Sequence, residues 1–559
     1  MQAVALSSAA KTRSLAPWVW YGLTALPVLY YIVMVALHAY NMPYMDDYPS
    51  IVDLLLRWQD ADWSERGRLL LEQNNFHRVV FLKLISLANY ALTGAVNFTF
   101  LQWVGNVAWL MIGWLLWRSL APVPDESTDP SDRRSPVKRI LTFLPAVYFL
   151  FQFQFWNNAF WSMAAICNLW VHAWALLSFY LAARQRIGWA LAAGALSLFT
   201  VGNGIVVLPL LIAGLLLNRQ WRQATVAVVV SAVLYAVYFS NYQNPSSAGL
   251  SSLLSVERII HFVQLDTAFL GATFYHPSVA WLSQVVGWLT IGWSLYLVIT
   301  RYDRQNPTLF WMVIFLHLTG LMLALNRIEN SVDVVFASRY RQVPALMLAV
   351  TYLTFADVLI SKRVVAWTWI FPLTLAAAVG INVVSNVTYF SKIVRFRELK
   401  QTDQLLWQRY GIVRGCSPLY QPAQRLSQLA ASGAFRPAPL TLDELVSQEV
   451  SLPQPTPTAS RLSHQIDLNR QDGSYLVVSG FAKITGQKAN FNDTYLAVQT
   501  PGGWRFFTTL FHQRLDKEDS LNDKDTGFTA VVPASVAGSS PKLGLFVRSG
   551  GKTAFQVIN

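Results

Sequence analysis

Two adjacent acidic residues, Asp46 and Asp47, follow the first long apolar segment of the chain, which extends roughly from residue 16 to residue 36. Placing carboxylates so close to a membrane boundary costs free energy unless they face water, a cation or a polar substrate. A carboxylate in such a position can act as a general base, so we interpret Asp46 and Asp47 as the candidate catalytic residues. The alternative is that they are the solvated start of a loop.

Several arginines gather around the start of a later apolar segment, which begins near Val343. Arginine is disfavoured at the outer end of a span by the positive-inside tendency. The guanidinium group is well shaped to bind phosphate through two hydrogen bonds, so we predict a phosphate-binding site. The alternative is that these side chains extend to lipid headgroups. The candidate phosphate-binding residues are Arg339, Tyr340, Arg341 and Arg327, together with Arg78 from the first outer loop.

Other polar residues expected on the same outer side could line a substrate cavity. His77 and Arg78 could position a charged donor or tune a base, and the alternative is that they make surface ion pairs. Asn157 and Asn158 lie between two tryptophans and could equally cap a helix. Asn203, between two glycines, could simply form a turn. The candidate cavity residues are thus His77, Asn157, Asn158 and Asn203.

The composition indicates a polytopic membrane protein. Of 559 residues, 54% are hydrophobic and only 13% are charged. The net charge of +13 comes mainly from Lys and Arg beside apolar segments, a pattern that reports membrane topology and not nucleic-acid binding. Cys167 and Cys416 are the only cysteines, so neither a disulfide framework nor a cysteine-based metal site is supported. The sequence has no nucleotide-cradling loop, which argues against an ATP-driven pump.

The basic flanks predict about 11 transmembrane helices, with the C-terminus outside. Lys11 and Arg13 place the N-terminus inside, before a retained first helix that is too long for a signal peptide. The stretch 187–217 has basic residues at both ends, so we divide it into two short helices at Gly202-Asn-Gly204. The other expected spans are 16–36, 97–117, 140–155, 160–183, 224–239, 281–299, 309–325, 343–360 and 365–389.

Three further stretches are expected to form helices on the outer membrane face. In 49–58 the apolar residues recur at helical spacing, opposite charged ones. The stretch 79–92 is short and is interrupted by Lys83, which favours an interfacial helix over a full crossing. The stretch 259–275 would break the topology if it crossed the membrane.

Beyond residue 390 the sequence turns soluble. A helical piece, 395–409, and a Pro/Ser/Thr-rich linker, 451–460, precede a series of short β-like runs separated by turn signals. The runs 475–479, 494–498, 504–510, 528–532, 542–547 and 554–558 predict a small β-sandwich. The chain is therefore expected to be mainly α, with a transmembrane domain 1–390, a helical segment and linker 391–460, and a periplasmic β-sandwich domain 461–559.

Together these motifs resemble the polytopic glycosyltransferases of the GT-C superfamily, which use a polyprenyl-phosphate-linked sugar. The resemblance covers about residues 1–390. Within the superfamily, the chain is most similar to uncharacterised bacterial members. The β-domain is similar to accessory modules that some members carry. The motifs that carry the resemblance are Tyr44-Met-Asp-Asp-Tyr48 with the interfacial helices after it, His77-Arg78, the paired short helices at Gly202-Asn-Gly204, and Ser338-Arg-Tyr340.

The resemblance implies an inverting glycosyltransferase of a bacterial inner membrane, which moves a sugar from a polyprenyl-phosphate-linked donor to a periplasmic glycan or lipid acceptor. Asp46 or Asp47 would deprotonate the acceptor hydroxyl. Arg339, with Arg327 or Arg341, would stabilise the departing phosphate. Some members use a divalent metal at the acidic pair and others do not, so a metal at Asp46 and Asp47 stays open, and no other cofactor is implied.

Two other functions fit the same features. A transporter or flippase of lipid-linked sugars would also explain broken helices and outer polar residues, although few ionisable residues fall in the middle of the spans. A non-catalytic membrane-anchored protein would use the β-domain to bind glycan. In the glycosyltransferase interpretation, the β-domain is expected to help hold or orient the acceptor glycan, because Trp504 on a strand face could stack on a sugar ring. The alternative is that Trp504 belongs to the core. The non-catalytic interpretation would leave the outer Asp and Arg clusters without a shared purpose.

Overall fold

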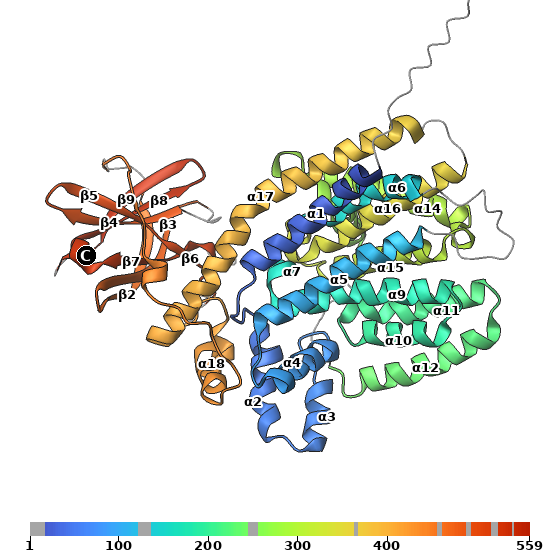
Figure 1. Cartoon of the computed structure of the whole chain (residues 1–559), viewed down its shortest axis with the longest axis horizontal. Coiled ribbons are helices and arrows are strands. Elements are labelled where there is room, and N and C mark those ends of the chain that lie inside the picture. The colour runs from blue at the N-terminus through green and yellow to red at the C-terminus, as the bar shows by residue number, and fades with distance from the viewer. Residues whose placement is uncertain are drawn as a thin grey trace, which may run out of the picture.

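The computed structural model describes residues 17–120, 136–243, 255–362, 367–454, 461–487, 493–515, 524–538 and 541–558. Its helices form one bundle and its strands form a separate C-terminal body, and one long helix runs from the bundle to the strands (Figure 1). Lys11 and Arg13, which carry the expected orientation of the first helix, lie outside the described residues.

Eight helices in the described part of the chain are long and apolar enough to cross a membrane. Apolar side chains on their outer surfaces are exposed, such as Leu29 at 58% and Val387 at 74%, which suits contact with lipid. The eight are α1 (Pro17–His38), α5 (Phe98–Ser119), α9 (Trp170–Ala183) with α8 (Ser162–Ala164) and η3 (Ala165–Leu169) before it, α12 (Trp221–Phe239), α14 (Trp281–Ile299), α15 (Pro307–Asn326), α16 (Gln342–Ser361) and α17 (Trp367–Tyr410).

Three shorter helices, α6 (Pro136–Leu150), α10 (Ile187–Leu198) and α11 (Val207–Leu217), lie in the same bundle (Figure 1). The expected break between two short helices is confirmed, because the turn η4 (Gly202–Val206) separates α10 from α11. A Cβ atom at Gly204 would lie 1.9 Å from a backbone oxygen of α10, so only glycine fits this turn.

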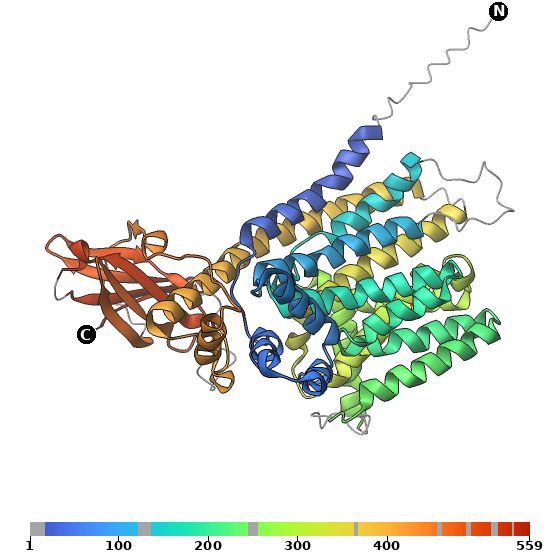
Figure 2. The same ribbon diagram turned by 60° about the horizontal axis from the view of Figure 1, so that its bottom comes forward.

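Short helices gather at one end of the bundle, and Figure 2 shows those of the N-terminal part in blue, beside the C-terminal body. Lys83 is buried among them, and its ammonium donates 2.7 Å hydrogen bonds to the carbonyls of Leu69 and Glu72. The charge that interrupts an apolar stretch therefore ties two of these helices together. The helices expected at 49–58, 79–92 and 259–275 are confirmed as η1 (Tyr48–Val52) with α2 (Asp53–Asp60), α4 (Val80–Thr93) and α13 (Val256–Leu270); α3 (Trp63–Leu71) and α18 (Pro422–Ala431) add to them.

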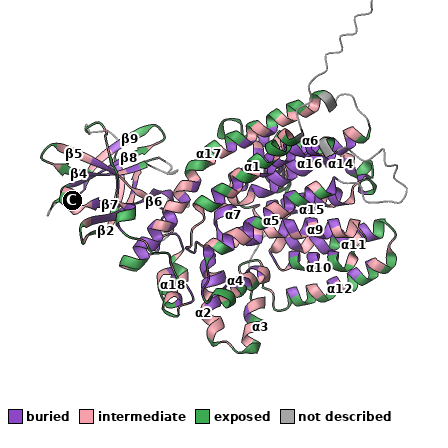
Figure 3. Ribbon diagram, in the orientation of Figure 1, coloured by how far each residue is buried: buried purple, intermediate pink, exposed green. Residues whose placement is uncertain are grey.

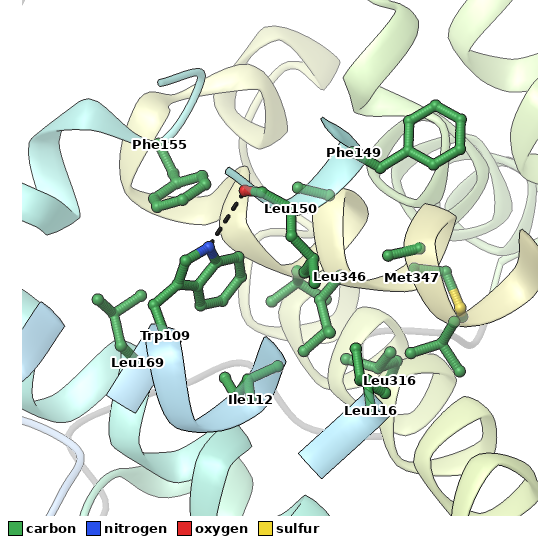
Figure 4. Packing of buried hydrophobic residues seen from close by; sticks show 14 of the residues in the cluster. Trp109, Ile112, Leu116, Phe149, Leu150, Phe155, Leu169, Leu316, Leu346 and Met347 are labelled. Carbon is green, nitrogen blue, oxygen red and sulfur yellow. Dashed lines mark hydrogen bonds between the residues drawn. The ribbon is translucent and has the colours of Figure 1, made fainter. Parts of the chain in front are cut away.

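The core of the bundle is apolar and rich in aromatic side chains, and the buried residues run through its centre (Figure 3). Trp109 of α5 is completely buried and packs against Phe155, with ring centroids 4.8 Å apart. Its indole N–H donates a 3.1 Å hydrogen bond to the carbonyl of Leu150, so this polar group is satisfied inside the core (Figure 4).

Helix α17 is one continuous element of 44 residues. The helix expected at 395–409 is confirmed, but it continues the helix of the last expected span without a break, so the expected domain boundary at 390 falls inside a helix. The C-terminal half of α17 stays helical because it remains packed on several sides. Phe396, Leu399 and Leu406 are buried there, against the strands and against the loop that holds the acidic pair.

The C-terminal body contains two antiparallel sheets, with strand orders β1-β5-β4-β8-β9 and β2-β3-β7-β6. Residues of both sheets, including Val478 and Leu496, share one buried cluster. The turns expected at 472–473, 501–503 and 549–552 are confirmed, because each joins two paired strands. The strands are β1 (Glu449–Val450), β2 (Leu462–Asp472), β3 (Tyr475–Ile484), β4 (Asp493–Thr500), β5 (Gly503–Thr508), β6 (Leu510–His512), β7 (Gly527–Pro533), β8 (Leu543–Ser549) and β9 (Lys552–Ile558).

Strand β2 was not expected from the sequence, although it is the longest strand. It lies at the edge of its sheet, where one side faces solvent. Ser, His, Gln, Asn and Arg therefore replace the alternating apolar residues that mark an interior strand.

Candidate functional site

The acidic pair lies in a tight turn between α1 and η1. The backbone N–H of Asp47 donates to the carbonyl of Tyr44 at 3.0 Å, and that of Tyr48 donates to the carbonyl of Met45 at 3.1 Å. Met45 has φ 45°, a left-handed conformation that costs a side-chain-bearing residue about 1 kcal/mol. The turn is thus strained at the residue immediately before Asp46.

Asp47 is not solvated, contrary to the expectation for an acidic pair at a loop start. Its side chain is completely buried, and its carboxylate accepts hydrogen bonds from the backbone N–H groups of Tyr44 at 3.0 Å and Met163 at 2.8 Å. Burial raises the pKa of Asp47 to about 7, while the nearby charge of Lys400 and the two N–H groups oppose that rise. Asp47 therefore fastens the turn to the segment that precedes α9.

Asp46 is half-buried, and no hydrogen bond from a described residue reaches its carboxylate. Burial raises its pKa, and the positive charge of Arg339 lowers it. Of the two carboxylates, Asp46 is the one that remains available to a ligand.

Arg339 is held on the short turn η10 (Ser338–Tyr340), and α7 (Trp156–Phe160) positions it. Asn158 is completely buried and donates a 3.0 Å hydrogen bond to the carbonyl of Arg339 and a 2.8 Å bond to the side chain of Gln342. Asn158 is therefore a structural contact of this turn. The Arg339 guanidinium lies 5.0 Å from the ring centre of Tyr340, and within the described chain its buried Nε has no hydrogen-bond partner.

The other predicted asparagine of α7, Asn157, contributes through its backbone. Its N–H donates a 3.2 Å hydrogen bond to the hydroxyl of Ser338, and that hydroxyl donates to the carbonyl of Gln154 at 2.9 Å. The side chain of Asn157 is half-buried. One segment, residues 154–163, thus holds Arg339 on one side and Asp47 on the other.

Three further predicted residues, Arg327, His77 and Asn203, make contacts that lead from Tyr340 to the turn η4. Arg327 donates a 2.8 Å hydrogen bond to the Tyr340 hydroxyl. Burial lowers the pKa of His77 to about 4, and the charge of Arg327 contributes, so His77 is neutral at pH 7. A Cβ atom at Gly202 would lie 2.4 Å from Nδ1 of His77, so the imidazole rests directly on this glycine. Next to it, Asn203 donates a 3.3 Å hydrogen bond to Thr319.

Arg78 and Arg341, two of the predicted phosphate ligands, already donate hydrogen bonds to other groups of the protein. Arg78 is buried and donates to the carbonyls of Tyr238, Leu71 and Ser240, which closes the end of α12. Arg341 is also buried, donates to the carbonyl of Phe336 at 2.8 Å and bonds the hydroxyl of Tyr389. Arg339 and Arg327 are thus the arginines of this set for which no hydrogen bond to a backbone carbonyl is found in the described part of the chain.

Sequence reasoning missed Lys400, which lies on the C-terminal half of α17. The residue is only 2% exposed, and its ammonium donates a 2.7 Å hydrogen bond to the carbonyl of Phe160, close to Asp47. Asp403 and Gln404 are buried on the same helix. Their spacing of three and four residues is that of a helix face, so a buried polar stripe was the available signal.

Asp46 and Asp47 do not provide enough free ligands for a metal site. Within the described residues, no three His, Cys, Asp or Glu side chains gather where they could hold a metal ion. Both carboxylate oxygens of Asp47 already accept backbone hydrogen bonds, which leaves Asp46 as a single open ligand. We therefore derive no step through a metal.

Trp504 is half-buried on strand β5, with its ring edge-on to Phe555 at a centroid distance of 5.2 Å. The two belong to a small aromatic cluster separate from the core that the two sheets share.

The fold and the site define a helical protein with membrane-length segments, a polar site at one end of the bundle and a C-terminal two-sheet domain. In comparisons with known proteins, no family model, no curated protein and no solved structure matches the chain.

Proposed function

We propose that the protein is an inverting membrane glycosyltransferase that moves a sugar from a polyprenyl-phosphate-linked donor to a periplasmic glycan or lipid acceptor. One observation carries the proposal: Asp46 lies in the electrostatic field of Arg339, and both retain side-chain atoms without a partner among the described residues. A base and a phosphate-binding cation are the two groups that this transfer requires.

In the proposed reaction, Asp46 accepts the proton of the acceptor hydroxyl while the hydroxyl oxygen forms a bond to the anomeric carbon. The bond from that carbon to the phosphate oxygen breaks, and its electron pair stays on the phosphate. Arg339 faces the charge that develops there, and Arg327, aligned through Tyr340, adds a second positive charge. One displacement inverts the anomeric centre.

His77 and Asn203 extend this face toward the turn at η4. The His77 imidazole is neutral and half-buried, with its Nδ1 resting against Gly202. A neutral ring nitrogen suits a sugar hydroxyl better than a phosphate, because it can accept or donate a single hydrogen bond. We therefore assign His77 and Asn203 to the sugar and the arginines to the phosphate.

The proposal includes 11 crossings, with the acidic pair and the C-terminal domain, a β-sandwich, on the periplasmic side. Eight long helices and the three shorter helices α6, α10 and α11 make up this number. The helix ends expected inside also meet one another: Asn306 donates to the carbonyl of Ser119 at 3.0 Å, and Gln220 donates to Gln185 at 2.9 Å.

The test is sugar transfer by the purified full-length chain in detergent, with a panel of defined polyprenyl-phosphate sugars and with release of polyprenyl phosphate as the readout. We expect one donor to be consumed by the wild type and not by Asp46→Asn. Asp60→Asn, which changes an exposed carboxylate on α2, is the matched control and should retain activity. Equal activity of wild type and Asp46→Asn would contradict the mechanism.

A further inference from the structure

The C-terminal domain contacts the turn that holds the acidic pair. Gln513, directly after strand β6, accepts a 2.7 Å hydrogen bond from the hydroxyl of Tyr44. The Gln513 amide in turn donates a 2.9 Å hydrogen bond to Asp525, which follows in the same domain. Tyr44 is 4%, Gln513 8% and Asp525 9% exposed. A buried polar chain therefore links residues that lie 469 positions apart.

Tyr44 is the residue from which the acidic turn begins. Its backbone N–H donates to the Asp47 carboxylate and its carbonyl accepts from the Asp47 N–H, both at 3.0 Å. Its ring packs edge-on against Trp161 and Phe396, at centroid distances of 5.5 Å and 4.9 Å. A displacement of Tyr44 would therefore move the whole turn.

The backbone conformation of Met45, the next residue, depends on contacts from outside the turn. Met45 adopts the left-handed conformation, which a residue with a side chain keeps only where its surroundings determine it. The loop after α17 supplies part of this constraint: the Met45 N–H donates to the carbonyl of Gly415 at 3.4 Å, and the thiol of Cys416 lies 3.6 Å from the Met45 carbonyl. Asp403 fixes that loop by accepting from the N–H groups of Arg414 and Gly415, both at 2.9 Å.

The β-domain is in turn fixed to the same helix. Strand β6 packs against α17, and the hydroxyl oxygen of Thr402 on α17 lies 3.3 Å from the carbonyl oxygen of Phe511. The backbone N–H of Leu515 donates to the carbonyl of Arg414 at 3.3 Å. Gln513 is therefore presented to Tyr44 from a rigid support.

We infer that Gln513 is a positioning residue for the acidic motif: by holding Tyr44, it keeps the strained turn in the conformation that directs Asp46 toward Arg339. The inference rests on the proposed function for its consequence in catalysis. It makes the C-terminal domain part of the transfer site itself, instead of a separate module that only holds the acceptor.

The experiment compares full-length wild type with Gln513→Leu, which keeps the size of the side chain and removes its hydrogen bonds. Gln454→Leu is the matched control, because Gln454 makes two hydrogen bonds to the backbone of Trp504 inside the same domain, away from the acidic turn. Hydrogen exchange is followed at the amides of Asp47, Tyr48 and Ser50, which are hydrogen-bonded in the turn. Turnover and donor KM are measured on the same samples.

We expect exchange at these amides to accelerate about ten- to a hundredfold in Gln513→Leu, since a buried tyrosine hydroxyl is left without its acceptor. Gln454→Leu should leave this exchange unchanged. Turnover should fall in Gln513→Leu while donor KM stays constant, because Arg339 is not displaced. Unchanged exchange in Gln513→Leu would overturn the inference, whatever happens to activity. Faster exchange in a protein whose wild type transfers no sugar would support the positioning role and contradict the proposed function alone.

Tyr44→Phe provides a second, independent variant that removes only the hydroxyl. If the two residues act through one hydrogen bond, the double variant Tyr44→Phe/Gln513→Leu should exchange no faster than the faster of the two single variants. Multiplicative effects in the double variant would overturn the coupling between them.

Discussion

Asp46 and Asp47 are neighbours in the chain, yet their carboxylates lie in different environments. Asp47 is completely buried and accepts two backbone hydrogen bonds. Asp46 is half-buried and experiences the charge of Arg339. The turn at Met45 separates the two, because it directs one side chain into the protein and leaves the other open. The acidic pair thus consists of one structural and one available carboxylate.

The first prediction distinguishes these two roles. Asp46→Asn should lower sugar transfer at least about a hundredfold, as expected for loss of a general base, and leave the unfolding temperature unchanged. Asp47→Asn should lower the free energy of unfolding by about 1–3 kcal/mol, because one amide NH₂ would face a backbone donor. Transfer kinetics and thermal unfolding at pH 8 measure both. Wild-type turnover in Asp46→Asn would place the base elsewhere.

The second prediction concerns the donor phosphate. Arg339→Lys keeps the charge but loses the two-pronged geometry, so it should be impaired, and Arg339→Ala should be nearly inactive. A charge-assisted contact to phosphate contributes about 1.5–3 kcal/mol, which corresponds to roughly a ten- to hundredfold loss in donor affinity or rate. Donor-dependent kinetics with a defined polyprenyl-phosphate sugar provide the measurement.

Arg341→Lys is the matched control for this series. Arg341 is buried and bonded to Phe336 and Tyr389, so its substitution should lower stability and leave donor KM unchanged in the fraction that folds. If Arg339→Ala kept wild-type donor kinetics, Arg339 would be a headgroup anchor and Arg327 the next phosphate candidate.

Local patterns in the sequence were sufficient for much of the secondary structure. The glycines at 202 and 204 mark the break between α10 and α11 because no side chain fits there, and the turn residues at 472–473 mark a hairpin because Gly473 has φ 58°. These signals depend on neighbours along the chain. The alternating strands of the β-domain were predictable for the same reason, except β2 at the edge.

The arrangement of the site depends on contacts that no local pattern contains. Asp47 meets Met163 across 116 positions, and Tyr44 meets Gln513 across 469. Arginines 78 and 341 looked like phosphate ligands because residue type and spacing do not reveal which carbonyls a folded chain brings to them. Residue type and position in the chain therefore selected the candidates, while their open or structural roles depended on contacts between distant parts of the chain.

The third prediction is a pH dependence that arises from His77. Its pKa is lowered from 6.5 to about 4 in the folded state by burial, so the unfolded chain binds the proton more tightly. Stability should be fully present above pH 6.5 and should be lost as the pH falls from 6.5 toward 4, by on the order of 2–3 kcal/mol. Thermal unfolding of wild type and His77→Asn between pH 4 and 8 measures this difference.

His276→Gln, at an exposed histidine, is the control for the pH series and should follow the wild-type curve. His77→Asn should lose less stability than wild type over the acidic range. Parallel curves for wild type and His77→Asn would show that the imidazole is not desolvated in the folded protein, and His77 would then lose its assignment as a neutral contact to the sugar.

The last prediction tests the proposed topology with an accessible cysteine. Both native cysteines are buried in the described structure, so the wild type should react little with an impermeant maleimide. Arg470 is exposed on strand β2, and Arg222 is exposed at the start of α12, on the end of the bundle expected inside. Arg470→Cys should therefore react from the periplasmic side of spheroplasts, and Arg222→Cys should react only after the membrane is opened. An odd number of crossings is expected between Arg222 and Arg470, so the two cysteines should lie on opposite sides of the membrane. The reverse labelling pattern would place the acidic pair inside and remove the periplasmic acceptor from the mechanism.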